Sequence, residues 1–248
     1  MENVFLRAST ELFTKHCYHE KIEMPVHQVK KINYDSVLIE LQKAAPFLKK
    51  SWKRQDNSND VRTDNVVYTA KTFSELENRC TEGPDVDFNY LVHRWYNYKT
   101  SDVIENIFCS YNIAKKEQNF RHKTIDFYLM DTPFDLKVSS FPKKFKMSRR
   151  AFSSEREYRN ALIRWLYDNQ SKERRNHEEN RLFVVCKHQS GKDSQQNLFL
   201  KMDFNQIQSK VDAFLRYSGK QVEQNKEPFN KVVLNSGKEV YSDVIFID

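Results

Sequence analysis

Three charged residues within an apolar stretch are the clearest chemical signal in this sequence. They are Asp126, Asp135 and Lys137, and they lie in segment 124–141. Apolar, aromatic and β-branched residues on both sides of a short break at 131–133 predict a β-hairpin. Strand interiors are depleted in aspartate and lysine, so three such residues in one hairpin call for an explanation.

A turn centred on residues 131 and 132 fixes the expected pairing of the two strands. It places Asp126 opposite Lys137 and Tyr128 opposite Asp135. Residues two apart on a strand share a face, so Asp126 is expected on the face of Asp135 and Lys137, with a Cβ distance to Asp135 of roughly 7 Å. Two carboxylates at that distance can share one hard divalent cation. A neighbouring ammonium group can steer a water or stabilise negative charge that develops on a phosphate.

A simpler interpretation of the hairpin needs no chemistry. Its polar face would then meet water at the edge of a sheet, and Asp126 and Lys137 would form an exposed ion pair that contributes little stability. The rest of the chain decides between the two interpretations.

Composition excludes several classes of protein. At 248 residues with 39% hydrophobic and 30% charged side chains, the chain suits one α/β domain or a core with a helical extension. With only 4 glycines, it contains no glycine-rich dinucleotide loop, no Walker loop and neither H-E-x-x-H nor G-x-S-x-G. No apolar run is long enough for a membrane span, and no signal peptide is visible.

The cysteines and histidines point to a reducing compartment. The 4 cysteines have no C-x-x-C spacing, so a disulfide framework is not expected and the cytoplasm is the predicted location. The tract from His16 to His19 lacks a second ligand pair at zinc-finger spacing, so no structural zinc is predicted there.

Positive charge is concentrated in one part of the chain. The formal net charge is +7, and residues 141–181 hold 12 Lys and Arg against 6 Asp and Glu. Such a patch is typical of a polyanion-binding surface, although a solvated helix face with i,i+4 charge pairs is the alternative. The residues expected to contact nucleic-acid phosphates are Lys143, Lys144, Lys146, Arg149, Arg150, Arg156 and Arg159.

The first 85 residues are predicted to form a helical accessory region packed on a core of residues 86–248. Apolar spacing predicts helices over 1–20 and 35–45. Residues 54–65 are polar and predict a loop and a domain boundary, and residues 66–70 predict a short strand.

An acidic helix precedes the hairpin. Helical spacing begins at Phe88, a polar break is expected at 98–101, and Asp102 with Glu105 fits a capping box that opens a second helix. Glu105 falls at the seam between the core face and solvent, so it is either a capping residue or a functional acid.

A crossover unit follows the hairpin. A helix opening at Ser154 leads to a buried strand at 181–188, a pattern typical of parallel strands joined by a helix. Beyond it the sequence predicts a strand at 197–203, a helix at 204–217 and a closing strand at 239–247.

This order of elements resembles the PD-(D/E)xK nuclease superfamily, whose restriction-endonuclease-like fold is a central mixed sheet flanked by helices. The resemblance covers about 85–190 and is carried by Glu105, Asp126 and Asp135-Leu136-Lys137, the one (D/E)-x-K in the chain. Ile125 replaces the family's proline, and the second acid is Asp rather than Glu. The resemblance implies that Asp126 and Asp135 bind Mg²⁺, that Lys137 orients the attacking water, and that Glu105 completes or supports the metal site.

The function implied is a Mg²⁺-dependent endonuclease that hydrolyses DNA, of which a restriction or defence enzyme is one form. Mn²⁺ is expected to substitute for Mg²⁺, RNA is the alternative substrate, and the family raises the expectation of a homodimer. Two other hypotheses stay open. One is a nucleic-acid-binding protein on the same fold without turnover, and the other is a partner-binding protein whose hairpin charges are surface decoration.

Overall fold

A computed structural model describes residues 25–49, 57–82, 87–119, 122, 124–169, 178–188 and 194–248. The predicted helix at 1–20 and the tract His16–His19 lie outside these ranges. The elements, in chain order, are α1 (Asp35–Ala44), η1 (Ala45–Lys49), α2 (Asn57–Thr69), α3 (Phe73–Glu82), α4 (Phe88–Phe108), β1 (Ala114–Lys116), β2 (Phe127–Leu129), β3 (Thr132–Ser140), η2 (Arg149–Ala151), α5 (Glu155–Asn169), β4 (Arg181–Cys186), α6 (Ser194–Phe199), η3 (Leu200–Met202), α7 (Phe204–Glu223), β5 (Lys231–Val233) and β6 (Glu239–Ile247).

The strands form one mixed six-stranded sheet in the order β1-β2-β3-β4-β6-β5. β1, β2 and β3 pair antiparallel, β4 lies parallel to both β3 and β6, and β5 returns antiparallel to β6. The predicted α/β class is therefore confirmed. The predicted crossover is confirmed as well, because α5 separates the parallel strands β3 and β4.

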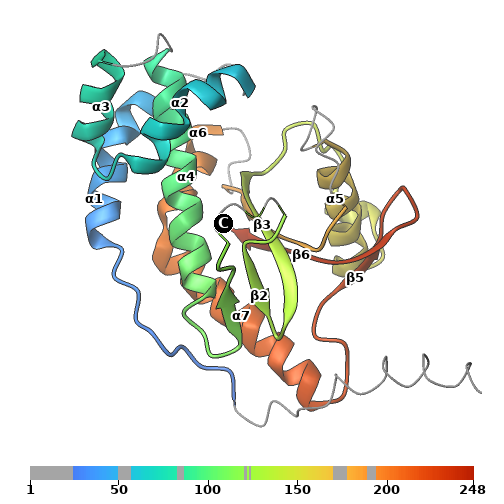
Figure 1. Cartoon of the computed structure of the whole chain (residues 1–248). Coiled ribbons are helices and arrows are strands. Elements are labelled where there is room, and N and C mark those ends of the chain that lie inside the picture. The colour runs from blue at the N-terminus through green and yellow to red at the C-terminus, as the bar shows by residue number, and fades with distance from the viewer. Residues whose placement is uncertain are drawn as a thin grey trace, which may run out of the picture.

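Helices cover both faces of the sheet (Figure 1). Alternate residues of the central strands point to opposite sides, so each face has its own core. Leu136, Leu182 and Ile245 belong to the core shared with α4 and α7. Phe183 and Val244 belong to the core shared with α5. β4 is buried along its whole length, as expected for a strand between two parallel neighbours.

The long helix α4 connects the N-terminal helices to the sheet (Figure 1). Asp87 caps its first turn by accepting a hydrogen bond from the Asn89 N–H. The predicted break at 98–101 is wrong, because the helix continues through it and the Thr100 hydroxyl donates to the Tyr96 carbonyl one turn earlier. Glu105 therefore lies in the last turn of one helix and is not part of a capping box.

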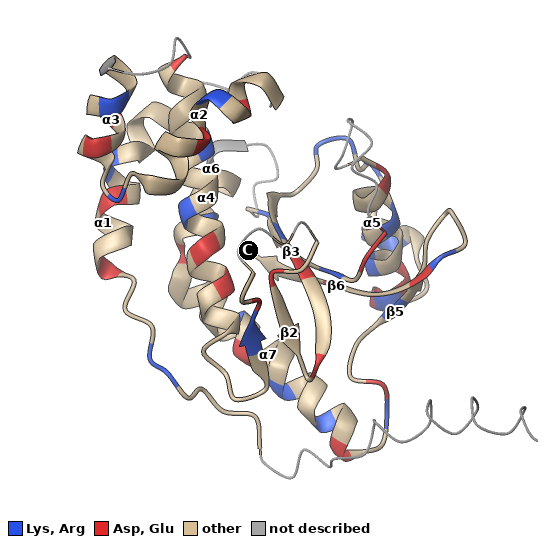
Figure 2. Ribbon diagram, in the orientation of Figure 1, with Lys and Arg blue, Asp and Glu red and all other residues tan. Residues whose placement is uncertain are grey.

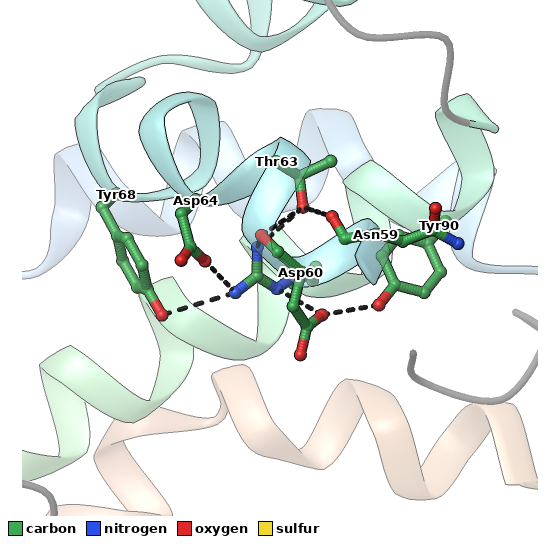
Figure 3. A network of polar contacts seen from close by, with 7 residues as sticks. Asn59, Asp60, Thr63, Asp64, Tyr68 and Tyr90 are labelled. Atoms are coloured by element: carbon green, nitrogen blue, oxygen red, sulfur yellow. Dashed lines mark hydrogen bonds and ion pairs between the residues drawn. The ribbon is translucent and has the colours of Figure 1, made fainter. Parts of the chain in front are cut away.

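The accessory region contains two further corrections. Residues 54–65, predicted as a loop, contain the start of α2, and most of the predicted strand at 66–70 is the end of α2. This helix is held to α4 by polar contacts that the sequence pattern does not reveal. Arg94 of α4 donates to the Asp60 carbonyl and the Thr63 hydroxyl, each at 2.7 Å, and pairs with the Asp60 carboxylate at 2.9 Å (Figure 3).

Buried residues of α1–α3 belong to the same core as the α4 face of the sheet. Leu41 and Leu76 are fully buried in it together with Phe134 of β3. The division into a region 1–85 and a core 86–248 stays a prediction.

The C-terminal third follows the sequence expectation closely, with one exception. The predicted strand at 197–203 is wrong, since that segment forms the end of α6 and all of η3. The predicted helix at 204–217 is confirmed and extends to Glu223, and the closing strand is confirmed at Glu239–Ile247. No helix in the described ranges is long and apolar enough to cross a lipid bilayer.

Candidate metal centre and nucleic-acid surface

The predicted hairpin is confirmed, but its turn lies one residue earlier than predicted, so each cross-strand partner shifts by two residues. The turn consists of Met130 and Asp131, both with positive φ (47° and 61°), and Leu129 pairs with Thr132. Two residues in this conformation are typical of a tight type I′ hairpin turn. Tyr128 therefore faces Pro133, and the predicted pairings of Tyr128 with Asp135 and of Asp126 with Lys137 are wrong.

The shift is even, so the paired residues Phe127–Leu129 keep the faces predicted for them. Asp126 now lies one step beyond the last pair of the β2–β3 ladder, Phe127 with Phe134, and its N–H donates to the Phe134 carbonyl at 2.9 Å. Asp126 is thus brought toward Asp135, the next residue of β3.

Asp126 is fixed by three hydrogen bonds. Besides the bond to Phe134, its carbonyl accepts from the Glu117 N–H at 3.0 Å. Its carboxylate Oδ2 accepts from the Leu136 N–H at 2.6 Å, so the side chain satisfies an N–H of β3 just beyond the end of β2. The carboxylate is therefore held against the strand that carries Asp135 and Lys137.

The other three predicted residues all act on the pKa of Asp126. Burial raises the pKa of Asp126 to about 6, and the nearby carboxylates of Asp135 and Glu105 act in the same direction. The Leu136 N–H and the Lys137 ammonium group oppose the rise. Asp126 is thus a partly buried acid influenced by all three of the other predicted site residues.

Asp135 is buried and contacts two cations. One carboxylate oxygen, Oδ1, accepts from the Lys137 ammonium group, and the other, Oδ2, accepts from Arg181 Nε at 2.9 Å. The Asp135 and Arg181 side chains are 7% and 8% exposed, whereas that of Lys137 is 39% exposed. Arg181 also lies over the ring of Tyr167, at 4.8 Å from its centroid.

Arg181 is a site residue that the sequence pattern does not identify. Its guanidinium reaches Asp135 because β3 and β4 pair in parallel with these two residues as direct partners. The available signal was an arginine at the first position of an otherwise apolar buried strand. The register that gives the residue its partner cannot be read from that strand alone.

Glu105 points toward β1, where its carboxylate pairs with Lys116 at 2.9 Å. Burial raises the pKa of Glu105, although the bond to Lys116 opposes the rise. Burial also lowers the pKa of Lys116, but the bond to Glu105 more than offsets this and the net shift is upward. Lys116 therefore keeps its proton at neutral pH, and the two form an ion pair beside Asp126.

The donor chemistry of Asp126 and Asp135 fits a hard divalent cation. Carboxylate oxygens are the protein ligands that Mg²⁺ prefers, and it takes one or two of them together with waters and substrate oxygens. Within the described ranges, no group of three or more His, Cys, Asp or Glu side chains is arranged to hold a metal ion. The pair of aspartates is therefore the candidate centre, and a ligand role for Glu105 stays a prediction.

The predicted phosphate-binding residues lie on α5 and on the segment that leads from β3 into it (Figure 2). In the described part of the chain, five of them have no ion-pair partner: Lys143, Lys144, Lys146, Arg150 and Arg156. Arg149 pairs with Glu155, and Arg159 pairs with both Glu155 and Asp243. The predicted set thus contains four unpaired cations before η2 and on it, two arginines with carboxylate partners, and Arg156 of α5, whose Nε donates to Asn230 Oδ1.

A cavity of about 870 Å³ lies between α5 and α7 beside β6, away from the two aspartates. β5 covers only the first three residues of β6, so the rest of that strand edge faces the cavity. Arg156 and Arg159 line it, and Arg159 pairs there with Asp243 at 3.0 Å. These two arginines therefore face a different surface from the unpaired lysines.

Comparisons with known proteins identify no relative: no family model, no curated protein and no solved structure matches the chain.

Proposed function

We propose that the protein is a metal-dependent endonuclease that hydrolyses phosphodiester bonds of DNA, built on a restriction-endonuclease-like core. The observation that carries this proposal is the position of Asp126. Its partly buried carboxylate, with a pKa raised to about 6, is held against β3 and influenced by Asp135, Lys137 and Glu105. A surface ion pair, the simpler interpretation of the hairpin, would not produce such an environment.

The order of elements also supports the proposed core. An acidic helix, α4, precedes the hairpin β2–β3, which carries Asp126 and then Asp135-Leu136-Lys137. Helix α5 then leads to the buried parallel strand β4. This is the arrangement expected from the resemblance to the PD-(D/E)xK nucleases.

Each residue has a defined role in the proposed reaction. Asp126 and Asp135 would hold Mg²⁺, or Mn²⁺ in its place, and the ion would polarise the scissile phosphate and raise the hydroxide fraction of a water. Lys137 would orient that water and balance the negative charge that develops on the phosphate. Glu105 with its partner Lys116 would support the position of Asp126.

The unpaired cations give the proposed enzyme a means of holding its substrate. They follow the carboxyl end of β3, and the three steps along that strand from Lys137 to Ser140 span about 10 Å. A nucleic-acid backbone could contact Lys143, Lys144 and Lys146 beyond that end while a further phosphate lies near Asp135. DNA is the proposed substrate and RNA the alternative.

A second candidate function is nucleic-acid binding without turnover. The observation in its favour is that Asp135 already has two cationic partners and Glu105 has one. A site in which protein cations permanently occupy the carboxylates would bind phosphates without activating a water.

A cleavage assay distinguishes the candidates. The protein is incubated with supercoiled DNA, linear DNA and single-stranded RNA in Mg²⁺, in Mn²⁺ and in EDTA. Cleavage that requires metal and is lost in Asp135→Ala and Lys137→Ala is the expected result. Salt-sensitive binding without cleavage supports the second candidate. Neither cleavage nor binding contradicts both and leaves a partner-binding protein.

Two further features remain proposals. A cytoplasmic location agrees with the three described cysteines, Cys80, Cys109 and Cys186, which are free thiols. A homodimer would allow both strands of DNA to be cut, and the sedimentation of the purified protein tests it.

A further inference from the structure

From the contacts of Asp135, we infer that Arg181 is a positioning residue: it holds one oxygen of Asp135 so that the other can face the metal ion. This inference rests on the proposed function. It concerns the partners of a single carboxylate, whose two oxygens are bonded to different cations, Oδ1 to Lys137 and Oδ2 to Arg181. A metal ion that binds Asp135 must displace one of these cations or share an oxygen with it.

Lys137 is the cation that a metal ion can displace from Asp135. Its side chain is 39% exposed, so the ammonium group regains water when it leaves Oδ1. Partly exposed ion pairs contribute little stability, so the exchange of Lys137 for a metal ion costs little. The released ammonium group stays next to the site, where the proposed reaction needs a cation.

Arg181 cannot leave in the same way. Its side chain is 8% exposed, its backbone is a direct partner of Asp135 in the β3–β4 ladder, and its guanidinium lies over the Tyr167 ring. Tyr167 is held in turn, because its hydroxyl donates to the Glu179 carbonyl at 2.6 Å. Separation of Arg181 from Asp135 would leave the buried guanidinium without its carboxylate, which is strongly unfavourable.

Because Lys137 can leave and Arg181 cannot, the orientation of the Asp135 carboxylate is fixed. Oδ2 stays bonded to Arg181 Nε, so Oδ1 is the single oxygen of Asp135 that becomes available to a metal ion. Hydrogen-bond partners that orient a metal ligand in this way typically change metal affinity by 10–100-fold when they are removed. Arg181 therefore acts through Asp135 and not on the substrate.

Direct measurement of Mn²⁺ binding tests the inference independently of cleavage. The amount of free Mn²⁺ is followed by electron paramagnetic resonance for the full chain and its variants. Arg181→Gln is expected to weaken Mn²⁺ binding about tenfold or more, and Arg181→Lys to recover part of the loss. Lys137→Met is expected to leave Mn²⁺ affinity equal or higher, because it removes the cation that competes for Oδ1.

A pair of substitutions at Tyr167 gives a second test if Arg181 variants fail to fold. Tyr167→Leu removes the ring under the Arg181 guanidinium and should weaken Mn²⁺ binding. Tyr167→Phe keeps the ring and should bind Mn²⁺ as the wild type does. Arg94→Lys is the matched control, since it alters a buried arginine–aspartate contact between α2 and α4. It should lower stability and leave Mn²⁺ affinity unchanged.

The outcomes separate this inference from the proposed function. If the wild-type protein binds Mn²⁺ and Asp135→Asn does not, but Arg181→Gln binds as the wild type does or more tightly, the positioning role is wrong and the metal site stands. The inference would also be overturned if Arg181→Gln lowered Mn²⁺ affinity no more than Arg94→Lys does. A wild-type protein that binds no Mn²⁺ overturns the proposed metal site and with it the role of Arg181.

Discussion

The Asp126 carboxyl group is subject to two opposing requirements. As a metal ligand it must be ionised, but in the folded protein without metal its surroundings favour the protonated form, since burial raises its pKa to about 6 from an ordinary value of 3.8. The folded state therefore binds this proton more tightly than the unfolded state does. Its contribution to stability is fully present below about pH 4 and is lost as the pH rises through about 6.

Asp126→Asn should accordingly stabilise the protein at neutral and alkaline pH. The amide cannot ionise, and its oxygen can still accept from the Leu136 N–H. We expect the free energy of unfolding at pH 8 to exceed that of the wild type by about 2 kcal/mol, with little difference near pH 4. Urea unfolding at both pH values measures the effect.

The same variant should lose Mn²⁺ binding, so that greater stability accompanies loss of the proposed function. Asp168→Asn removes an exposed carboxylate and controls for the change in net charge. A wild-type protein that is more stable than Asp126→Asn at pH 8 would show that the ionised carboxylate is favoured by the fold.

At the scale of elements, polar contacts centred on Arg94 hold α2 to α4. Arg94 is 9% exposed, and its guanidinium contacts Asp60, Thr63 and Asp64 of α2 (Figure 3). The hydroxyl of Tyr90 donates to the same Asp60 carboxylate. The apolar pattern of α2 is weak, with four buried residues of which two are polar, so these polar contacts supply much of its attachment.

Arg94→Met should therefore destabilise the protein strongly. It removes the Arg94 cation from the buried Asp60 carboxylate, and loss of one partner of a buried pair costs about 3–5 kcal/mol. The midpoint of urea unfolding measures the loss. Arg79→Met, which removes an arginine near the C-terminus of α3, is the comparison and should cost much less. Equal effects of the two substitutions would contradict the assigned role of Arg94.

Elements with strong local patterns could be predicted from the sequence, and those set by distant contacts could not. β6 and α7 carry clear periodicity of apolar residues and were placed correctly. The turn is expected at 131–132 because Pro133 is a residue type common in turns. In the structure the turn residues are Met130 and Asp131, which adopt the left-handed conformation. Nothing about a methionine indicates positive φ in advance.

The candidate site follows the same rule. The pattern of charges identified Asp126, Asp135 and Lys137, because their spacing on two strands is a local property. Arg181 lies 46 residues after Asp135 and reaches it only through the pairing of β3 with β4. The position of Glu105 likewise depended on the continuity of α4, which a polar segment had concealed.

At the scale of the whole molecule, the distribution of positive charge matters more than its total. The excess in residues 141–181 accounts for most of the net charge of +7, but the structure neutralises part of it through the pairs of Arg149 and Arg159 with carboxylates. The lysines between β3 and η2 remain exposed and unpaired within the described ranges. They should therefore dominate binding to a polyanion.

The salt dependence of nucleic-acid binding tests this division of charge. Each phosphate neutralised by a cation adds about 0.9 to the slope of log affinity against log salt concentration for duplex DNA. A variant with Lys143, Lys144 and Lys146 all changed to Gln should therefore lower the slope by about 2–3 and weaken binding to every sequence alike. Fluorescence anisotropy with a labelled duplex at several salt concentrations measures the slope.

The matched control changes Lys30 and Lys31 to Gln, because these lysines are also exposed but belong to the segment before α1. Neither variant removes a side-chain contact found among the described residues, so both should melt as the wild type does. If the control lowers the slope as much per lysine as the triple variant does, binding reflects net charge alone. A slope unchanged in the triple variant would place the nucleic-acid surface elsewhere, with the cavity arginines Arg156 and Arg159 as the next residues to change.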